Sequence, residues 1–473
     1  LKLDSILYYN NKNQYKCKPG WGYYLDNKAV FLDTAGEWHY NANTSIASII
    51  PERPLSHDDL VEGSYIKNGM VISSNTSYIT VKNLHFSKYY NNGIIAQGMN
   101  HSIHIDSCTF SNIYKTAIVL KEGASHGSVT NNIIRDIYGS AMMLLEINNF
   151  DIGHNIIKRI GMIPGYGIDG INGGLGICIC NNEYRPDGYT RLSHHNIIRH
   201  NQIDSVGWIA IRMDGHDNIC EYNVAKYANV TYNDGGIFHC WGLDSMYTYN
   251  NIIRNNIFSY NHGYTRGTPG DHLMINGIYL DNYSNNIHVI NNTVTDVGSG
   301  VLVNDGAFNN TIKGNTLYGN KKQLSFAEWN EHRLKAVCEN NYATNNILFN
   351  TNNLGHTLSI KHTYKPDHDP GYIDSNIYVS PFEKYHVEKE TMEEGCKITR
   401  NYTFATWQEN SDNDEHSVFI PLDVNSKSII LVNEGVNEKT FILKKGIIYK
   451  TVHGETVQDK VTIPAFGSMI LMY

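Results

Sequence analysis

A short unit recurs along most of the chain, and this repeat limits the possible folds more than any other feature. Each unit holds an asparagine or other polar residue, a β-branched run, a gap, a glycine or alanine, and a second apolar run; residues 107–120 and 131–144 are examples. A unit of this length cannot bury its own apolar face, so copies must stack. The β-branched and amide-rich composition predicts an all-β fold, a right-handed parallel β-helix, with asparagine side chains stacked at one corner.

The length of each coil is measured by the apolar residue after its glycine or alanine. That spacing is 24 residues twice, then 35, 34, 26 and 41, and returns to 23 for the positions Ile94, Ile118, Met142, Ile177, Ile211, Ile237, Ile278 and Val301. The extra residues must leave the coils as loops, which we place at 161–173, 184–195, 224–235 and 259–276. Loops on a rigid solenoid often carry function, and loops on consecutive coils predict the walls of one cleft.

Three segments differ in sequence character. We expect the β-helix over 61–415 and a small C-terminal antiparallel β-sandwich over 416–473, where short alternating strands replace the repeat. Residues 1–60 are irregular and aromatic, and we interpret them as an N-terminal cap or the remnant of a β-rich domain.

The composition excludes several classes of function. The net charge is −8 without a Lys/Arg run, which argues against nucleic-acid or anionic-membrane binding. No stretch of about 18 apolar residues is present, so no membrane span is expected. Eight cysteines are too few for a disulfide framework, and Cys178 and Cys180 are expected as buried free thiols. We expect a monomer without a cofactor.

Four aspartates stand at related positions of the repeat. Asp214 and Asp281 share one register, Asp305 follows one step later, and Asp234 lies two residues before Gly236. We place Asp234 and Asp281 two coils apart, or about 10 Å along the stack. Leaning side chains could then span from the roughly 5 Å of a retaining glycosidase to the roughly 9 Å of an inverting one.

Two carboxylates are what glycoside cleavage requires. One carboxylic acid protonates the leaving oxygen, and one carboxylate acts as nucleophile or activates water. The alternative is a structural role, because Asp-Gly is a common turn dipeptide. Our catalytic candidates are Asp234, Asp281 and Asp214. Asp214 and Asp305 fit the structural alternative better than Asp281 does, and Asp234 fits it least.

Side chains suited to sugars surround these acids. Aromatic faces pack on sugar CH groups, while His and Arg orient hydroxyl or carboxylate groups. We predict substrate contacts from Trp208, Trp241, Tyr232, Tyr279, His239, His216 and Arg212. Arg212 faces the cleft if Ile211 points inward, whereas alternation alone leaves both orientations open for His239.

A metal site is the weaker interpretation of the longest insertion. His262, Asp271 and His272 lie there, but their spacing matches no metal-binding signature, so we interpret them as solvated loop residues.

Several segments resemble bacterial right-handed β-helix glycosidases. Residues 31–40 (FLDTAGEWHY) are similar to the "LDTPGEWYYD" that precedes their coils, 232–242 (YNDGGIFHCWG) to "NDGGAIYTWG", and 277–282 (GIYLDN) to "GIYLDD". Residues 403–417 are similar to their "TLAEWQ…DxHS" exit from the helix, and 464–468 (PAFGS) to their final "PPFSS".

The chain therefore resembles glycoside hydrolase family 141, with family 120 next. The resemblance implies Asp234 and Asp281 as the catalytic acids, a pectic fucoside or xylan-like plant cell-wall glycan as substrate, and a secreted or periplasmic bacterial enzyme. The sequence departs from the pattern at residues 238–240, where Phe-His-Cys replaces Tyr-Thr before Trp241.

Two other functions stay open. A polysaccharide lyase would abstract a proton next to a uronate carboxylate with Lys or Arg, for which the candidates are Arg212, Arg254 and Lys121. A non-catalytic glycan-binding solenoid is the third possibility, and loop insertions alone do not distinguish it from an enzyme.

Overall fold

The computed structural model describes residues 28–167, 173–181, 192–264, 273–328, 337–351, 355–362, 368–381, 386–423 and 425–473, and the chain divides into two compact units. The described part of the first unit is 28–65. It contains the 3-10 helix η2 (Ala29–Phe31) and an antiparallel pair of strands, β1 (Trp38–Asn41) and β2 (Ile46–Ile49).

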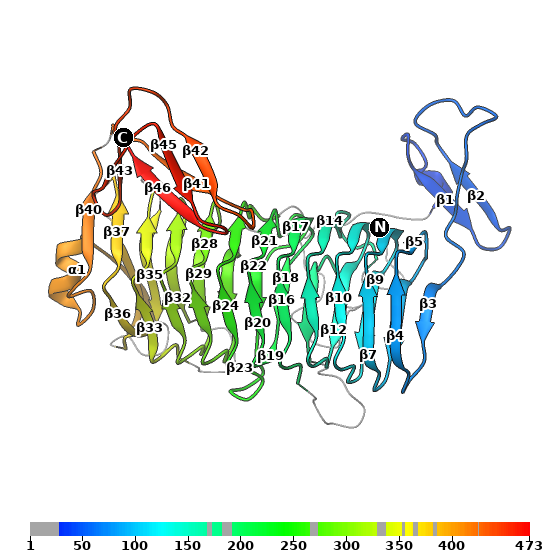
Figure 1. Cartoon of the computed structure of the whole chain (residues 1–473), viewed down its shortest axis with the longest axis horizontal. Coiled ribbons are helices and arrows are strands. Elements are labelled where there is room, and N and C mark those ends of the chain that lie inside the picture. Colours follow the sequence, from blue (N-terminus) through cyan, green and yellow to red (C-terminus); the bar gives the residue numbers. More distant parts are fainter. Residues whose placement is uncertain are drawn as a thin grey trace. The chain divides into compact units, whose positions relative to one another are not determined.

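The second unit is a right-handed parallel β-helix, as the repeat predicts (Figure 1). Within the described residues its coils form three long sheets. The 13-stranded sheet contains β3 (Asn68–Ile72), β6 (Asn92–Gln97), β9 (Thr116–Lys121), β12 (Ser140–Leu145), β15 (Ile177–Cys180), β18 (Ile211–Met213), β22 (Gly235–Cys240), β26 (Ile275–Leu280), β29 (Ser299–Asn304), β32 (Lys322–Ala327), β35 (His356–His362), β38 (Val387–Glu393) and the antiparallel β39 (Cys396–Tyr402).

After its strand in the first sheet, each coil contributes one strand to each of the two other long sheets. The described strands of the 11-stranded sheet are β4 (Ser77–Lys82), β7 (His101–Asp106), β10 (Ser128–Thr130), β13 (Asp151–Gly153), β16 (Ile197–Arg199), β20 (Ile219–Glu221), β24 (Ile252–Arg254), β27 (His288–Ile290), β30 (Thr311–Lys313), β33 (Asn341–Thr344) and β36 (Gly371–Asp374). Those of the 12-stranded sheet are β5 (His85–Ser87), β8 (Thr109–Ile113), β11 (Ile133–Ile137), β14 (Ile156–Ile160), β17 (Gln202–Val206), β21 (Val224–Lys226), β25 (Ile257–Ser259), β28 (Thr293–Thr295), β31 (Thr316–Tyr318), β34 (Ile347–Phe349), β37 (Ile377–Ser380) and β40 (Val418–Pro421).

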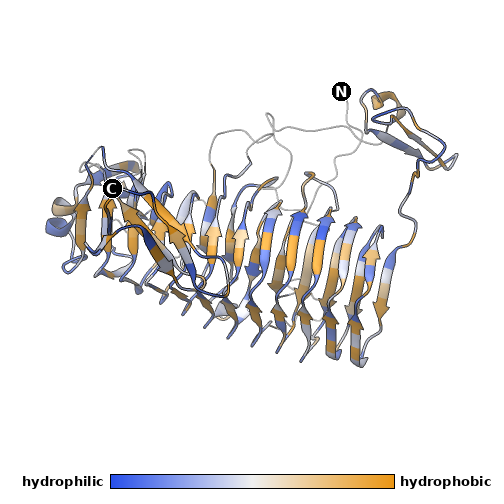
Figure 2. Ribbon diagram, turned by 45° about the horizontal axis from the view of Figure 1, so that its top comes forward, coloured by the Kyte–Doolittle hydropathy of each residue, from blue (hydrophilic) through white to orange (hydrophobic). Residues whose placement is uncertain are grey.

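The core is a stack of apolar side chains inside the coils. Figure 2 shows hydrophobic residues recurring on strand after strand. In the 13-stranded sheet, Ile94 pairs with Ile118, and the row continues through Met142 and Ile177 to Ile211. All are fully buried. Because one coil alone exposes its apolar interior at both ends, each coil is stabilised by its neighbours.

One register differs from the sequence-based prediction. Phe238, not Ile237, pairs with Ile211 and with Ile278. Ile237 instead occupies the position that Ala210 and Gly277 hold on the neighbouring coils. The sequence was misleading because Ile237 is the first apolar residue after two glycines, while the small residue expected at its position is absent.

A ladder of buried asparagines runs along the corner between the 11-stranded and 12-stranded sheets. Each side-chain amide donates to the side-chain oxygen of the asparagine on the next coil at 2.9–3.0 Å. The members are Asn132, Asn155, Asn201, Asn223, Asn256, Asn292, Asn315, Asn346 and Asn376. The stacked corner amides predicted from the repeat are therefore present.

The C-terminal end of the helix is covered by a short helix, α1 (Phe404–Asn410), whose buried residues are Phe404 and Trp407. Asp414 is fully buried beside it and accepts hydrogen bonds from Trp407 Nε1 (2.8 Å), Tyr378 Oη (2.8 Å) and Ser417 Oγ (2.6 Å). These residues belong to the segment that resembles the exit from the helix in the glycosidases.

The chain ends in small antiparallel sheets. They are formed by β41 (Ser428–Val432), β46 (Ser468–Met472), β43 (Tyr449–Thr451) and β44 (Thr456–Val457), and by β42 (Lys439–Ile442) with β45 (Lys460–Ile463). This part packs on the 12-stranded sheet through apolar contacts and through a hydrogen bond between Ser468 and Thr293. The last parallel strand, β40, lies beyond residue 415, where we had placed the start of the sandwich.

Free thiols are the state of every cysteine in the described residues. Cys178 and Cys180 are buried, as expected, with their sulfur atoms 3.2 Å apart, whereas Cys396 is exposed. None of the helices in the described part of the chain is long and apolar enough to cross a membrane.

Candidate active site

Three successive strands of the 13-stranded sheet carry or directly adjoin most of the predicted site residues. β18, β22 and β26 lie side by side, and their inward residues are core side chains. The alternate residues point to the outer face of the sheet, where Arg212 pairs with His239 and His239 with Tyr279. The orientation that the sequence left open for His239 is thus outward.

Asp281 follows β26 and lies among hydrogen-bond donors. Its Oδ1 accepts from Asn304 Nδ2 at 2.8 Å and from the Asn282 backbone nitrogen at 3.0 Å, and its Oδ2 lies 3.4 Å from His239 Nε2. The side chain of Asp281 is 15% exposed. It is therefore held in one orientation while part of it stays accessible. We call Asp281, His239, Tyr279 and Asn304 the carboxylate cluster.

Tyr279 fills the centre of the carboxylate cluster. Its ring meets the His239 ring edge to face at 4.9 Å, and its hydroxyl oxygen accepts from Asn304 Nδ2 at 3.3 Å. Burial raises the pKa of Tyr279 well above its usual value, and the negative charges of Asp281 and Asp234 raise it further. The phenol is thus protonated at neutral pH, and both carboxylates lie within electrostatic reach of it.

Arg212 and Asp214 form a buried ion pair next to the cluster. Arg212 Nη2 lies 2.7 Å from Asp214 Oδ2, and the two side chains are 9% and 0% exposed. Asp214 Oδ1 also accepts from the Trp241 backbone nitrogen at 3.0 Å. Asp214 therefore neutralises Arg212 and anchors the end of β22, so neither the predicted catalytic role of Asp214 nor direct substrate contact by Arg212 agrees with this burial.

Trp241 connects this ion pair to the carboxylate cluster. The guanidinium of Arg212 lies 5.9 Å from the centre of the indole. With the amide of Asn282 oriented to satisfy both neighbours, its oxygen accepts from Trp241 Nε1 at 2.9 Å and its nitrogen donates to Asp281 Oδ1 at 3.1 Å. The ion pair and the carboxylate cluster therefore both fix the position of Trp241.

Asp234 stands at the other end of β22, exposed and in the left-handed backbone conformation (φ 56°) that aspartate tolerates better than most residues. Its carbonyl oxygen accepts from Trp208 Nε1 at 2.7 Å, and the Trp208 and Tyr232 rings lie 5.9 Å apart. A Cβ atom at Gly235 would come within 2.8 Å of Trp208 Nε1, so the glycine permits this close packing. These residues form a second, aromatic group.

The predicted spacing of Asp234 and Asp281 is wrong. β22 and β26 are direct neighbours, so the two residues are one coil apart, not two. They also flank opposite ends of the paired strands, which separates their backbones by the length of a six-residue strand, about 20 Å. The 259–276 insertion lies within this single coil, which explains why 47 residues were misinterpreted as two coils.

His216 lies outside both groups. It belongs to β19 (Gly215–His216), which pairs with β23 (Thr248–Tyr249), and its ring stacks between those of His194 and Tyr249 at 5.1 and 4.8 Å. Sequence reasoning missed Asn304, although its place on the coil after Asp281 follows from aligning residues 301–304 with 278–281.

The other lyase and metal candidates are not brought to the cluster. Arg254 pairs with Glu221 at 2.7 Å in the 11-stranded sheet, and Lys121 lies in β9, several coils earlier. His262 is exposed, whereas Asp271 and His272 lie outside the described residues. Among the residues that the structure describes, no three His, Cys, Asp or Glu side chains are grouped to hold a metal.

The chain is similar to known proteins in structure but not in sequence. No protein-family model matches the chain, and no curated protein matches it in sequence. Similar solved structures include the PL6 family alginate lyase AlyGC, with 16% identity and a TM-score of 0.41 over 74% of this chain and 54% of that chain. This chain thus spans about half the length of that lyase.

Two further structures cover more evenly matched lengths. A tailspike protein of E. coli bacteriophage HK620, solved with a pentasaccharide, has 9% identity and a TM-score of 0.35 over 85% of this chain and 84% of that chain. The periplasmic alginate epimerase AlgG has 12% identity and a TM-score of 0.35 over 75% and 78%. At such identities the likeness concerns the fold alone.

Proposed function

We propose that the protein is a glycoside hydrolase that cleaves a plant cell-wall type glycan, a pectic fucoside or a xylan-like chain, outside the cytoplasm. The observation that supports this proposal is the environment of Asp281. It is a partly exposed carboxylate on the outer face of the sheet, fixed by Asn304 and Asn282 and set against His239. A preorganised, accessible carboxylate is the group that protonates a leaving glycosidic oxygen or activates water.

Asp234 is the second carboxylate of the proposal. Its charge reaches Tyr279, as does that of Asp281. Even with both side chains extended toward each other, a backbone separation of about 20 Å exceeds both the roughly 5 Å of a retaining pair and the roughly 9 Å of an inverting one. The proposal therefore depends first on Asp281, and the resemblance nominates Asp234 as its partner.

The test is substitution of each acid. Asp281→Asn and Asp234→Asn should each lower kcat by a factor on the order of 100 or more, with thermal unfolding near that of the wild type. Asp244→Asn, at an exposed site after β22, is the matched control and should keep full activity. Full activity of both acid variants would refute the roles, and proton NMR of the first-formed anomer shows whether the configuration is retained or inverted.

A polysaccharide lyase is the second candidate, favoured by the contact between His239 and Tyr279. Imidazole and phenol can abstract a proton and protonate a leaving oxygen, and both lie beside Asp281. An ultraviolet-absorbing unsaturated product from a uronate-containing glycan would support elimination over hydrolysis. Tight glycan binding with no product of either kind would instead support a non-catalytic binding protein.

A further inference from the structure

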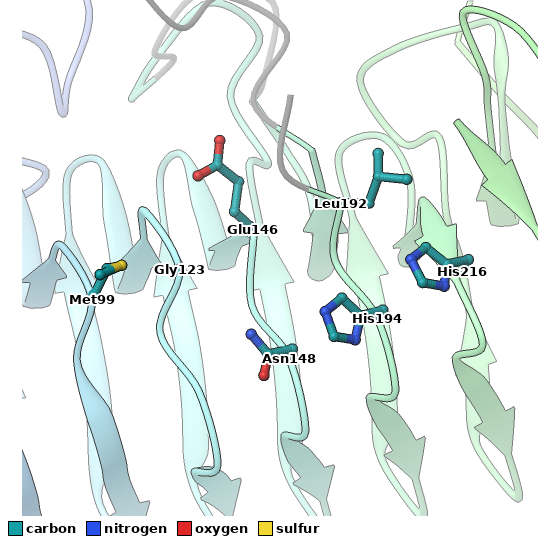
Figure 3. A pocket seen from close by; sticks show the side chains of 7 residues that line it. All are labelled: Met99, Gly123, Glu146, Asn148, Leu192, His194 and His216. Atoms are coloured by element: carbon teal, nitrogen blue, oxygen red, sulfur yellow. The ribbon is translucent and has the colours of Figure 1, made fainter. Parts of the chain in front are cut away.

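A pocket opens beside the 13-stranded sheet, on coils that precede the carboxylate cluster (Figure 3). Its volume is about 410 Å³, within the range of small-ligand sites. Its lining consists of Met99, Gly123, Glu146, Asn148, Leu192, His194 and His216. Only His216 was expected from the sequence to contact substrate.

The pocket lies along the same edge of the sheet as Asp281. Glu146 follows β12 directly, just as Asp281 follows β26. Because the strands are parallel and stacked in register, residues that follow them line one edge. The coil of His216 is two coils before that of Asp281, which is about 10 Å along the stack. A glycan chain bound along this edge would reach both the pocket and Asp281.

The lining combines donors, acceptors and apolar surface. Glu146 is 2% exposed and brings a carboxylate, Asn148 an amide, and Met99 a thioether. Burial and the nearby rings of His216 and His195 lower the pKa of His194 below its usual value, so this imidazole is neutral at neutral pH. Its Nδ1 faces Nδ1 of His195 at 2.9 Å. A sugar donates and accepts hydrogen bonds through its hydroxyl groups, so it needs a lining that contains both kinds of partner.

We infer that this pocket is a sugar-binding subsite for a hydroxyl-rich residue of the glycan chain whose reacting bond lies at Asp281. The inference rests on the proposed function and extends it. The substrate is a chain that lies along the helix axis, so cleavage efficiency rises with chain length up to the pocket.

The repeat supplies a matched pair of variants. Leu120 pairs with Leu144, so Glu122 holds on one coil the position that Glu146 holds on the next. Glu122 does not line the pocket, and its side chain is 41% exposed. Glu146→Gln removes the pocket carboxylate while preserving the side-chain shape, and Glu122→Gln makes the same change outside the pocket.

Binding is measured first, in the full chain carrying Asp281→Asn to prevent turnover. By calorimetry with neutral xylohexaose, cellohexaose and mannohexaose, at least one should bind, and adding Glu146→Gln should weaken its Kd about tenfold. Adding Glu122→Gln should leave that Kd unchanged. The inference is wrong if none of the three chains binds or if both Gln variants bind equally.

Turnover then separates this inference from the proposed function. In the enzyme with Asp281 intact, the rise in kcat/KM from disaccharide to hexasaccharide should shrink about tenfold in Glu146→Gln and persist in Glu122→Gln. An unchanged rise in Glu146→Gln would overturn the subsite. Hydrolysis by the Asp281→Asn protein would instead refute the proposed function, while the difference in Kd between the two Gln variants would still support the subsite.

Discussion

Arg212 and Asp214 point to the outer face of the sheet and yet form an ion pair sealed from solvent, with 2.7 Å between Nη2 and Oδ2. An outward strand position is normally accessible to water, so this burial shows that the pair is covered on the outer face as well. The pair is a fixed part of the wall beside Asp281 and Trp241. Its energetics can be measured separately from catalysis.

Breaking the ion pair should be costly. Asp214→Ala leaves Arg212 buried without its counter-charge, and we expect a loss of about 3 kcal/mol in the free energy of unfolding. The double variant Arg212→Met/Asp214→Leu removes both charges and should lose less. Urea unfolding followed by circular dichroism provides the comparison, and an equal loss in both proteins would contradict this view of the pair.

Asn304 should act through Asp281. Asn304→Leu removes the 2.8 Å hydrogen bond to the carboxylate while nearly preserving side-chain volume, so we expect kcat to fall about tenfold with KM little changed. Asn304→Asp, which adds a like charge beside Asp281, should fall further. Steady-state kinetics on the substrate of the wild type test both, and a change in KM alone would assign Asn304 to binding.

The asparagine ladder should depend on its interior members. Asn223 accepts from both the backbone nitrogen and the side-chain amide of Asn201, and it donates to Asn256. Asn223→Ala leaves buried donors unpaired, and we expect a loss of about 2–3 kcal/mol in the free energy of unfolding. The exposed Asn131 is the control, since Asn131→Gly should change stability little. Hydrogen exchange of neighbouring coils would show the local effect.

Asp414 should make stability depend on pH. Burial raises the pKa of Asp414, although hydrogen bonds from Ser417, Trp407 and Tyr378 oppose the shift. A raised folded pKa stabilises the protein most below the unfolded value of about 4, and that contribution is lost as pH rises through the folded pKa. Asp414→Asn should remove this component. Chemical unfolding from about pH 4 to 7 tests it, and an unchanged pH profile in the variant would argue against it.

The sequence predicted the β-helix and its asparagine corner because both repeat on every coil. It also nominated Trp208, Tyr232 and Asp234 for the site, but not the contacts that join them across two coils. It failed where a single coil departs from the rule. At β22 a large residue, Ile237, replaces the usual small one, and before β26 an insertion hides the coil boundary. Periodicity cannot report burial either, which is why Asp214 and Arg212 were expected to be accessible.

The carboxylate cluster shows the same limit in a different form. His239 and Tyr279 were nominated by residue type, but their contact depends on a register that was misplaced by one residue. Asn304 carries no chemical signal of its own. Only its position beside Asp281 on the next coil gives it a role, and that position is a property of the stack.

The asparagine ladder joins partners that lie from 22 to 46 residues apart in the chain, at almost constant hydrogen-bond length. The corner therefore keeps its geometry whatever the length of the excursion between two asparagines. The geometry of the β-helix is therefore independent of the length of its loops. A loop beside Asp281 could be shortened, lengthened or transplanted from another coil as a cassette, and substrate range could diversify while the scaffold beneath it stays unchanged.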